Sequence, residues 1–304
     1  MKTSELPEAV KTGFAPAAAY DAHRPSYPEE AVEQLLQGLK VAGVKGANFA
    51  DLAAGTGKFT ELLARRPEEY DIIAIGTHDG MRAQLAQKNL ARVRIMKGTA
   101  DNLVGIPDGS LAGVVAAQVS DFSVRFATMD ALKEIARVLK PTGGFGGIWN
   151  IDDCALDLDS HRPGPQAHQE PTDNSPRSWK IYPGWESVMR DVVWTLDDNM
   201  PRFRHEKWRQ VFDDRTESDP LSPQFADSLF KLPLGESEVE FEAWLSKDAV
   251  WSRLRTPSQL AILEGEEREK VRKTFWDSVD SESTKTDEFR AGCRAWPNCV
   301  LLDK

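Results

Sequence analysis

The chain has 304 residues, of which 40% are hydrophobic and 28% are charged, and this composition is typical of a globular protein rather than a disordered one. The formal net charge of −10 argues against binding to a nucleic-acid backbone, because proteins that bind nucleic acids concentrate lysine and arginine. No apolar run approaches the length of a membrane span and the first residues lack the apolar centre of a signal peptide, so we expect a cytoplasmic protein with no membrane partner.

The first predicted elements are a helix and a strand–turn–helix unit. Residues 28–40 carry apolar side chains on one helical face, with Pro28 in the first turn. Residues 48–53 form a short apolar strand, which leads through the turn at residues 54–57 into a helix over residues 58–66.

Strands and helices continue to alternate after this unit. The pattern predicts a strand at 71–75, a helix at 80–89, strands at 93–97 and 111–118, a helix at 128–139 that is stopped by residues 140–144, and a strand at 145–150. Such alternation is typical of βαβ crossovers. It predicts an α/β fold with a doubly wound, mainly parallel sheet and helices on both faces.

The remaining third of the chain is less regular. Residues 152–180 are rich in proline, aspartate, histidine and serine, and we expect a flexible loop or lid there. Helices are predicted near residues 186–198 and 265–280, and an antiparallel strand with one wet face at residues 237–245.

These features predict four segments in the chain. They are an N-terminal lid or cap segment at residues 1–40, a Rossmann-like core at 41–151, the flexible loop at 152–180, and a C-terminal part of the core at 181–304 with a helical cap and antiparallel strands.

A glycine-rich turn follows the first strand. Gly55 and Gly57 would let the backbone approach a ligand closely at the carboxyl end of that strand, where ligands bind in open α/β sheets. A third glycine at dinucleotide spacing is missing, which argues against NAD. The three cysteines and five histidines lack metal-ligand spacing, and we predict no metal site.

A set of longer motifs resembles the class I S-adenosylmethionine (SAM)-dependent methyltransferases, particularly a branch with many fungal small-molecule enzymes. The motifs are Tyr20–Tyr27, Asp51–Lys58, Gly80–Leu85, Gly98–Asp101, Ala116–Gln118, Glu134–Pro141 and Gly147–Asn150. The resemblance implies a Rossmann-like methyltransferase fold with a sheet of the seven-stranded type.

The resemblance also implies where SAM would lie. Asp51, Ala53, Gly55 and Gly57 would face the methionyl part, Ala100 and Asp101 would border the adenine, and Gln118 would lie where the fourth strand opens onto the donor methyl. An alternative for Asp101 is a helix or turn cap.

An N-terminal segment would close over donor and acceptor. Tyr20, Arg24 and Tyr27 match that segment of the family. The alternative is that these three side chains only pack and pair at the surface.

The SAM motif is degraded at one position. The family carries an acidic residue at the end of the second strand, whose carboxylate accepts hydrogen bonds from both ribose hydroxyls, and Gly76 is the aligned residue here. Each such bond contributes roughly 1.5–3 kcal/mol, so we expect the loss of two to weaken donor binding a hundredfold or more. Asp79 is an alternative acceptor, three residues further on.

Two more positions depart from the family pattern. Ala53 replaces the usual first glycine of the turn, which carries little weight. After Gln118 the family continues with a stretch similar to Ala-Phe-His-Trp that lines the acceptor site, whereas this chain has Val119–Ser123 with Asp121 at its centre. We therefore expect a different acceptor chemistry.

The departures at Gly76 and Asp121 favour an enzyme of small-molecule biosynthesis that no longer methylates. We expect a cyclisation, isomerisation or elimination on an apolar substrate with no cofactor required, in which Asp121 acts as general base and Tyr20, Arg24 and Tyr27 donate hydrogen bonds. The alternative is a SAM-dependent methyltransferase acting on a hydroxyl, thiol or amine. A third hypothesis is a non-catalytic binding or regulatory partner, and the oligomeric state is left open.

Overall fold

The computed structural model describes residues 21–119, 128–152, 184–196, 229–230, 235, 237, 239–255, 258–281, 288–297 and 302–303. The helices are α3 (Glu29–Gly38), α4 (Lys58–Ala64), α5 (Asp79–Gln87), α7 (Met129–Val138), α8 (Trp185–Thr195), α10 (Lys247–Leu254), α11 (Ser258–Ala261) and α12 (Gly265–Ser281). The strands are β1 (Asn48–Leu52), β2 (Asp71–Gly76), β3 (Val93–Lys97), β4 (Leu111–Ala117), β5 (Leu139–Asp152), β6 (Val239–Ser246), β7 (Glu288–Pro297) and β8 (Leu302–Asp303).

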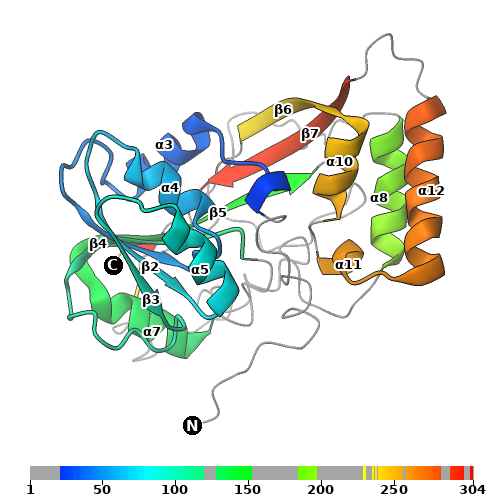
Figure 1. The fold of residues 1–304 in the computed structure, drawn as a ribbon. Helices are drawn as coiled ribbons and strands as arrows, with labels where there is room; N and C mark the ends of the chain where they lie inside the picture. Colours follow the sequence, from blue (N-terminus) through cyan, green and yellow to red (C-terminus); the bar gives the residue numbers. More distant parts are fainter. Residues whose placement is uncertain are drawn as a thin grey trace, which may run out of the picture.

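One sheet organises the described part of the chain, with the strand order β3-β2-β1-β4-β5-β7-β6 and with β8 paired to β5 (Figure 1). The first five strands in this order run parallel to one another, whereas β7 runs antiparallel to both β5 and β6, and β8 runs antiparallel to β5. The predicted doubly wound, mainly parallel α/β fold is confirmed, and so is the antiparallel strand predicted near residues 237–245.

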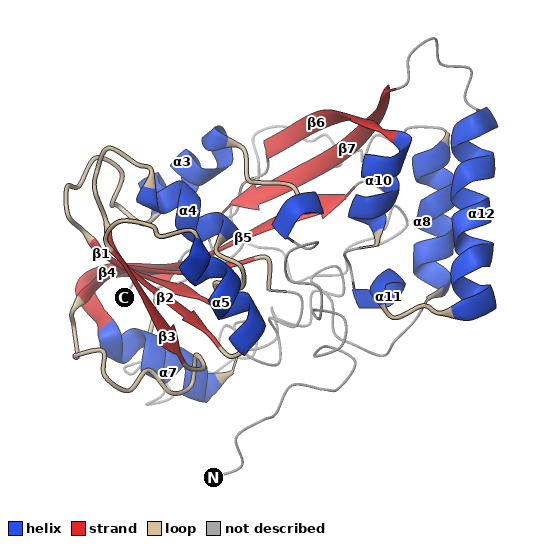
Figure 2. Cartoon of the chain, in the orientation of Figure 1, coloured by secondary structure: helices blue, strands red, loops and turns tan. Residues whose placement is uncertain are grey.

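Helices cover both faces of this sheet, as the secondary-structure view shows (Figure 2). On one face, α3 and α4 pack their apolar residues against alternate residues of the parallel strands, including Phe49, Val115 and Ile148. On the other face, α7 packs against the residues of opposite parity, including Ala50 and Val114. This alternation follows from the period of two along a strand.

The start of β5 differs from the prediction. The sequence Lys140–Gly144 was expected to form a turn between α7 and the strand, but β5 begins directly at Leu139. Leu111 of β4 pairs with Leu139, whereas Gly113 pairs with Gly144, so β5 bulges between the two pairs. Gly143 allows this close approach, because a Cβ atom there would lie 3.1 Å from the carbonyl oxygen of Ala112.

A second hydrophobic core lies beside the outer strands, where α8, α10 and α12 pack together. Phe275 of α12 is fully buried, stacks on Trp251 of α10 and meets the ring of Trp185 of α8 edge to face. The helices predicted near residues 186–198 and 265–280 correspond to α8 and α12, and both contribute buried residues to this core. The helix α10, which also packs in it, was not predicted.

The predicted lid lies almost entirely outside the described residues. Asp152, the first residue of that expected loop, is the last residue of β5. None of the described helices is long and apolar enough to cross a membrane.

Candidate functional site

The order of the parallel strands places a ligand-binding edge between β1 and β4. The connections from β1 lead outward through β2 to β3, whereas those from β4 lead the opposite way to β5. In open α/β sheets, ligands bind beyond the carboxyl ends of the strands at such a reversal. The turn after β1 and residue Gln118 after β4 both lie at this edge.

Asp51 lies in β1 immediately before this edge and is fully buried. Its Oδ2 atom accepts a 2.5 Å hydrogen bond from the hydroxyl of Thr60 in α4. Its Oδ1 atom is buried and has no hydrogen-bond partner among the described residues. Burial raises the pKa of the Asp51 carboxyl to about 7, and hydrogen bonds from Thr60 counteract the rise only in part.

An unpartnered carboxylate oxygen in the interior is a costly feature. A buried polar atom without a hydrogen bond costs about 1–3 kcal/mol, and an ionised one costs more. A ligand that carries a cationic or hydrogen-bond-donating group would remove this cost. Oδ1 of Asp51 is therefore a candidate site for a hydrogen-bond donor from a ligand.

The turn after Asp51 has the backbone conformation that its glycines allow. Ala53, Gly55 and Gly57 have φ angles of +54°, +57° and +82°, all in the left-handed region. Gly57 also packs tightly, because a Cβ atom there would lie 2.2 Å from Cδ1 of Leu85. Ala53 replaces a glycine without a collision, since its side chain is exposed.

The segment before α3 is attached to this turn. The carboxylate of Asp21 accepts a hydrogen bond from the hydroxyl of Thr56 at 2.7 Å and pairs with the ammonium of Lys88 at 3.0 Å. Tyr27 is buried and its ring meets that of Phe59 edge to face. Arg24 lies between these two residues and is half-buried. The structure thus brings this predicted segment to the glycine-rich turn.

At the end of β2, the main-chain carbonyl of Gly76 is bonded to a guanidinium from α5. Nη1 of Arg82 donates a 2.8 Å hydrogen bond to the carbonyl oxygen of Gly76, and Arg82 also pairs with Asp79. The carboxylate of Asp79 is 79% exposed, and it pairs with Lys97 as well. Asp79 therefore faces solvent and two cations, and the structure does not support it as a replacement ribose acceptor.

Gln118 does not extend into open space, although the resemblance places it next to the donor methyl. Its side-chain Nε2 donates to the carbonyl oxygen of Asn150 at 3.0 Å, and its Oε1 accepts from the Asn150 backbone N–H at 2.8 Å. The Gln118 amide thereby continues the pairing of β4 with β5 beyond the last regular strand residue. Its backbone φ of +54° marks the bend that makes this possible.

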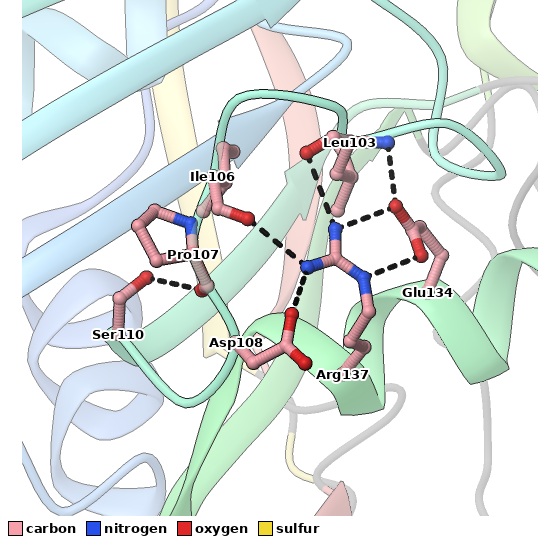
Figure 3. A network of polar contacts seen from close by, with 7 residues as sticks. All are labelled: Leu103, Ile106, Pro107, Asp108, Ser110, Glu134 and Arg137. Atoms are coloured by element: carbon pink, nitrogen blue, oxygen red, sulfur yellow. Dashed lines mark hydrogen bonds and ion pairs between the residues drawn. The ribbon is translucent and has the colours of Figure 1, made fainter.

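The loop between β3 and β4, which carries Ala100 and Asp101, is held by an ion-pair network (Figure 3). Arg137 of α7 donates to the carbonyl oxygens of Leu103 at 3.3 Å and Ile106 at 3.0 Å. Glu134 pairs with Arg137 and accepts a 3.0 Å hydrogen bond from the Leu103 backbone N–H. Arg137 lowers the pKa of the Glu134 carboxyl, so the pair stays ionised. Ala100 is buried in this loop and Asp101 is exposed.

We expect Arg137→Lys to lower the free energy of unfolding by about 1–2 kcal/mol, because an ammonium cannot reach two carbonyl oxygens and a carboxylate at once. Asp108 also pairs with Arg137, but its carboxylate is 79% exposed. Asp108→Asn is the matched control and should cost less than about 0.5 kcal/mol. Urea denaturation of both variants measures the difference, and equal losses would contradict this account of the loop.

Two of the predicted catalytic residues lie outside the described residues, namely Tyr20 and Asp121. The structure describes the other predicted site residues and brings Asp51, the turn and the segment containing Arg24 and Tyr27 together at one edge. Sequence reasoning missed Thr60 as the partner of Asp51, and it treated Asn150 only as part of a motif. In the described part of the chain, no three histidine, cysteine, aspartate or glutamate side chains are grouped as a metal site would require.

Residues 49–143 match the family model of a methyltransferase domain. An uncharacterized methyltransferase from Schizosaccharomyces pombe is 34% identical over 157 residues, which cover 49% of this chain and 59% of the relative. An uncharacterized methyltransferase from Mycobacterium tuberculosis is 33% identical over 138 residues, which cover 45% of this chain and 51% of the relative. The chain thus matches between half and three-fifths of the length of these two relatives.

The fold has a counterpart among solved structures. A protein from Anaeromyxobacter dehalogenans, described as a candidate type II methyltransferase, superposes with a TM-score of 0.56 at 17% identity. The superposition covers 92% of this chain and 97% of that protein. At this identity the likeness supports the fold alone.

Proposed function

Because the chain is a member of the class I SAM-dependent methyltransferase superfamily, we propose that it transfers a methyl group from SAM to a small-molecule acceptor. The relatives reported above are described as methyltransferases, and this favours the alternative in the sequence analysis over its main expectation. A cyclisation, isomerisation or elimination without SAM receives no support from the comparisons.

The observation that carries the proposal is the unpartnered Oδ1 atom of Asp51. The methionyl part of SAM carries an ammonium group, which would supply both the missing hydrogen bond and a compensating charge. The turn that contains Gly55 and Gly57 follows this carboxylate closely in the chain, and both glycines have left-handed backbone angles. Asp51 and the turn are the residues that we propose to hold the methionyl end.

When bound, SAM supplies a methyl group on a sulfonium centre that is open to attack by a nucleophile. The protein's part is to align the acceptor with this methyl group and to take up a proton where the acceptor loses one. Asp121 is still the predicted proton acceptor, and Arg24 and Tyr27 lie on the segment that would cover the reactants.

The ribose end of the site fits SAM less well. Gly76 offers no carboxylate, and Arg82 lies against its carbonyl group. This one observation keeps a non-methylating reaction as the second candidate, because it predicts weak donor binding. The two candidates differ in whether turnover needs added SAM.

We expect Gly76→Glu to tighten SAM binding by at least tenfold. A side chain fits at this position, since a Cβ atom would contact only Cγ of Arg82 at 3.6 Å and the φ angle is not left-handed. The carboxylate would accept hydrogen bonds from the ribose hydroxyls, each contributing roughly 1.5–3 kcal/mol. Isothermal titration calorimetry with SAM measures the change.

Gly76→Gln is the matched control for this experiment. It adds the same bulk and one neutral acceptor, so its gain should be smaller than that of the charged side chain. Equal affinities for all three proteins would show that SAM does not bind in this orientation.

The proposed function itself is tested by incubating the protein with SAM and candidate hydroxyl, thiol and amine acceptors. S-adenosylhomocysteine and a product heavier by one methylene group are the expected result. Product that forms at an unchanged rate without SAM, at unchanged mass or with loss of water or carbon dioxide, would overturn the proposal in favour of the second candidate.

A further inference from the structure

A second unpartnered polar atom lies at the same edge of the sheet, on Asn150 of β5. Asn150 is only 4% exposed. Its backbone N–H and carbonyl are both hydrogen-bonded to the Gln118 side chain, so its main chain is fixed. Its side-chain Nδ2 donates to the carbonyl oxygens of Pro25 at 3.4 Å and Ser26 at 3.1 Å. Its Oδ1 atom is buried and has no hydrogen-bond partner in the part of the chain that the structure describes.

The chemistry of these contacts fixes which end of the amide is the oxygen. A carbonyl oxygen is only an acceptor, so the atom that faces Pro25 and Ser26 must be the NH₂ group. Rotating the amide by half a turn would place Oδ1 against two other oxygens. Oδ1 therefore lies on the opposite side of the planar amide from residues 25–26, as a bare acceptor.

This acceptor belongs to a different part of the site from Asp51. Asp51 is in register with Val115, and Val115 with Gly146, so Asn150 lies four residues further along the strands. Four residues span about 13 Å in a strand. Ile148, which shares its face of the sheet with Asn150, packs in the same core as Phe49 of β1. The two buried acceptors thus line one face, too far apart for a single small group to bridge.

We propose that Oδ1 of Asn150 accepts a hydrogen bond from the methyl-accepting substrate. At that point the substrate carries a hydrogen-bond donor, which is a hydroxyl, an amine or an amide N–H. The inference rests on the proposed methyl transfer, because it assumes that the group bound at Asn150, which lies too far from Asp51 to be held by it as well, belongs to the methyl-accepting substrate. It excludes a carboxylate at this point, since two acceptors would then face each other without a proton.

The first test is a crystal structure of the full chain with S-adenosylhomocysteine. A ligand or water within hydrogen-bond distance of Oδ1 supports the proposal. A protein donor on Oδ1, from any segment of the chain, overturns it. This test uses the unaltered protein and does not depend on the stability of a variant.

The second test is a ligand-observed NMR screen of the protein saturated with S-adenosylhomocysteine. The probes are pairs of small aromatic and aliphatic fragments, each with a hydroxyl or amine in one member and its methylated form in the other. We expect the members with the free donor to bind preferentially and to lose at least about tenfold in affinity in Asn150→Ala, the loss that corresponds to one buried hydrogen bond.

Asp21→Asn is the control for this screen. It weakens the attachment of the same N-terminal segment through Lys88 while leaving Oδ1 of Asn150 unchanged. Fragment affinities should fall much less in this variant than in Asn150→Ala, because the acceptor atom is still present. A screen in which Asp21→Asn acts like Asn150→Ala, in which methylated fragments bind equally well, or in which no binding depends on Asn150, overturns the proposal.

The outcomes separate this inference from the proposed function. Tight SAM binding with no dependence of any fragment on Asn150 leaves methyl transfer standing and removes the Asn150 assignment. If the protein binds neither SAM nor S-adenosylhomocysteine, the screen is run on the protein alone. Fragment binding that depends on Asn150 in that screen removes the proposed methyl transfer, but it keeps Asn150 as a site that accepts a hydrogen bond from a ligand.

Discussion

Asp51→Asn is expected to weaken SAM binding on the order of 100-fold at pH 8 and, in the same experiment, to make the protein more stable. The carboxylate is fully buried and its Oδ1 atom lacks a partner among the described residues. The neutral amide gives up the attraction to an ammonium group, which accounts for the lost affinity. It also removes a charge that burial disfavours, which accounts for the gained stability.

The direction of the stability change follows from the pKa of Asp51. Burial raises this pKa from 3.8 to about 7 in the folded protein. Between these two values the unfolded chain has released the proton and the folded protein still holds it. The free energy of unfolding of the unaltered protein therefore falls as the pH rises from about 4 to about 7, by up to about 4 kcal/mol in total. Asp51→Asn lacks this contribution, so its advantage should be largest above pH 7 and absent below pH 4.

Ligand binding should show the opposite trend with pH. Only the ionised carboxylate attracts an ammonium group, so the affinity of the unaltered protein for SAM should fall about tenfold per pH unit below pH 7. The affinity of Asp51→Asn should not vary over this range. Calorimetric titrations at several pH values between 5.5 and 8.5, with urea denaturation at the same values, measure both effects.

Thr60→Val is the matched control, because it keeps the carboxylate and removes the hydroxyl that donates to Oδ2. Without this hydrogen bond the charged form is less stable, and the pH midpoint for SAM binding should move upward. An unchanged SAM affinity in Asp51→Asn would show that the donor does not contact this residue.

Most of the parallel sheet could be predicted from the sequence because its signals are local. The periodicity of apolar residues predicts strands such as residues 93–97 and amphipathic helices such as α7. The predicted ends of these two elements agree with the observed ends to within three residues. The strand at 139–144 could not be predicted in this way. Lys140, Pro141 and the glycines look like a turn, and only the pairing with β4 and β8 makes them part of a strand.

The site was less predictable because its properties depend on partners that lie far away in sequence. The motif that contains Asp51 was recognisable, but its raised pKa arises from burial in the folded protein, and the hydrogen bonds from Thr60 that partly offset the rise come from another element, α4. Gln118 was expected beside the donor methyl, and nothing in its own motif indicates that its amide is taken up by the backbone of Asn150. Likewise, nothing in the motif around Gly76 indicates that Arg82 donates to its carbonyl oxygen or that Asp79 is exposed.

Gly57→Ala is expected to lower the free energy of unfolding by about 2–5 kcal/mol and to abolish measurable SAM binding. Two costs add at this position. The φ angle of +82° costs a residue with a side chain about 1–2 kcal/mol. The new methyl group would also lie 2.2 Å from Cδ1 of Leu85, which is itself buried, and such overpacking costs about 1–3 kcal/mol.

Gly43→Ala separates these two costs. Gly43 has a φ angle of +75°, and a Cβ atom there would meet nothing within 4 Å. It should lose only the conformational part, about 1–2 kcal/mol, and keep its affinity for SAM because it lies outside the turn. Losses as large as those of Gly57→Ala would show that backbone conformation, and not packing, governs both positions.

The collision with Leu85 is tested directly by a double-mutant cycle. Leu85→Ala alone should cost about 2–5 kcal/mol, because it empties a buried position. In the Gly57→Ala background the same truncation makes room for the new methyl group, so the double variant should lose at least about 1 kcal/mol less than the sum of the two single losses. Strict additivity in urea denaturation would mean that the turn moves away from α5 instead of pressing on it. Because Gly57 and Asp51 flank the same edge of the sheet, recovery of SAM binding in the double variant would show that the position of the turn, and not the glycine itself, is what the donor requires.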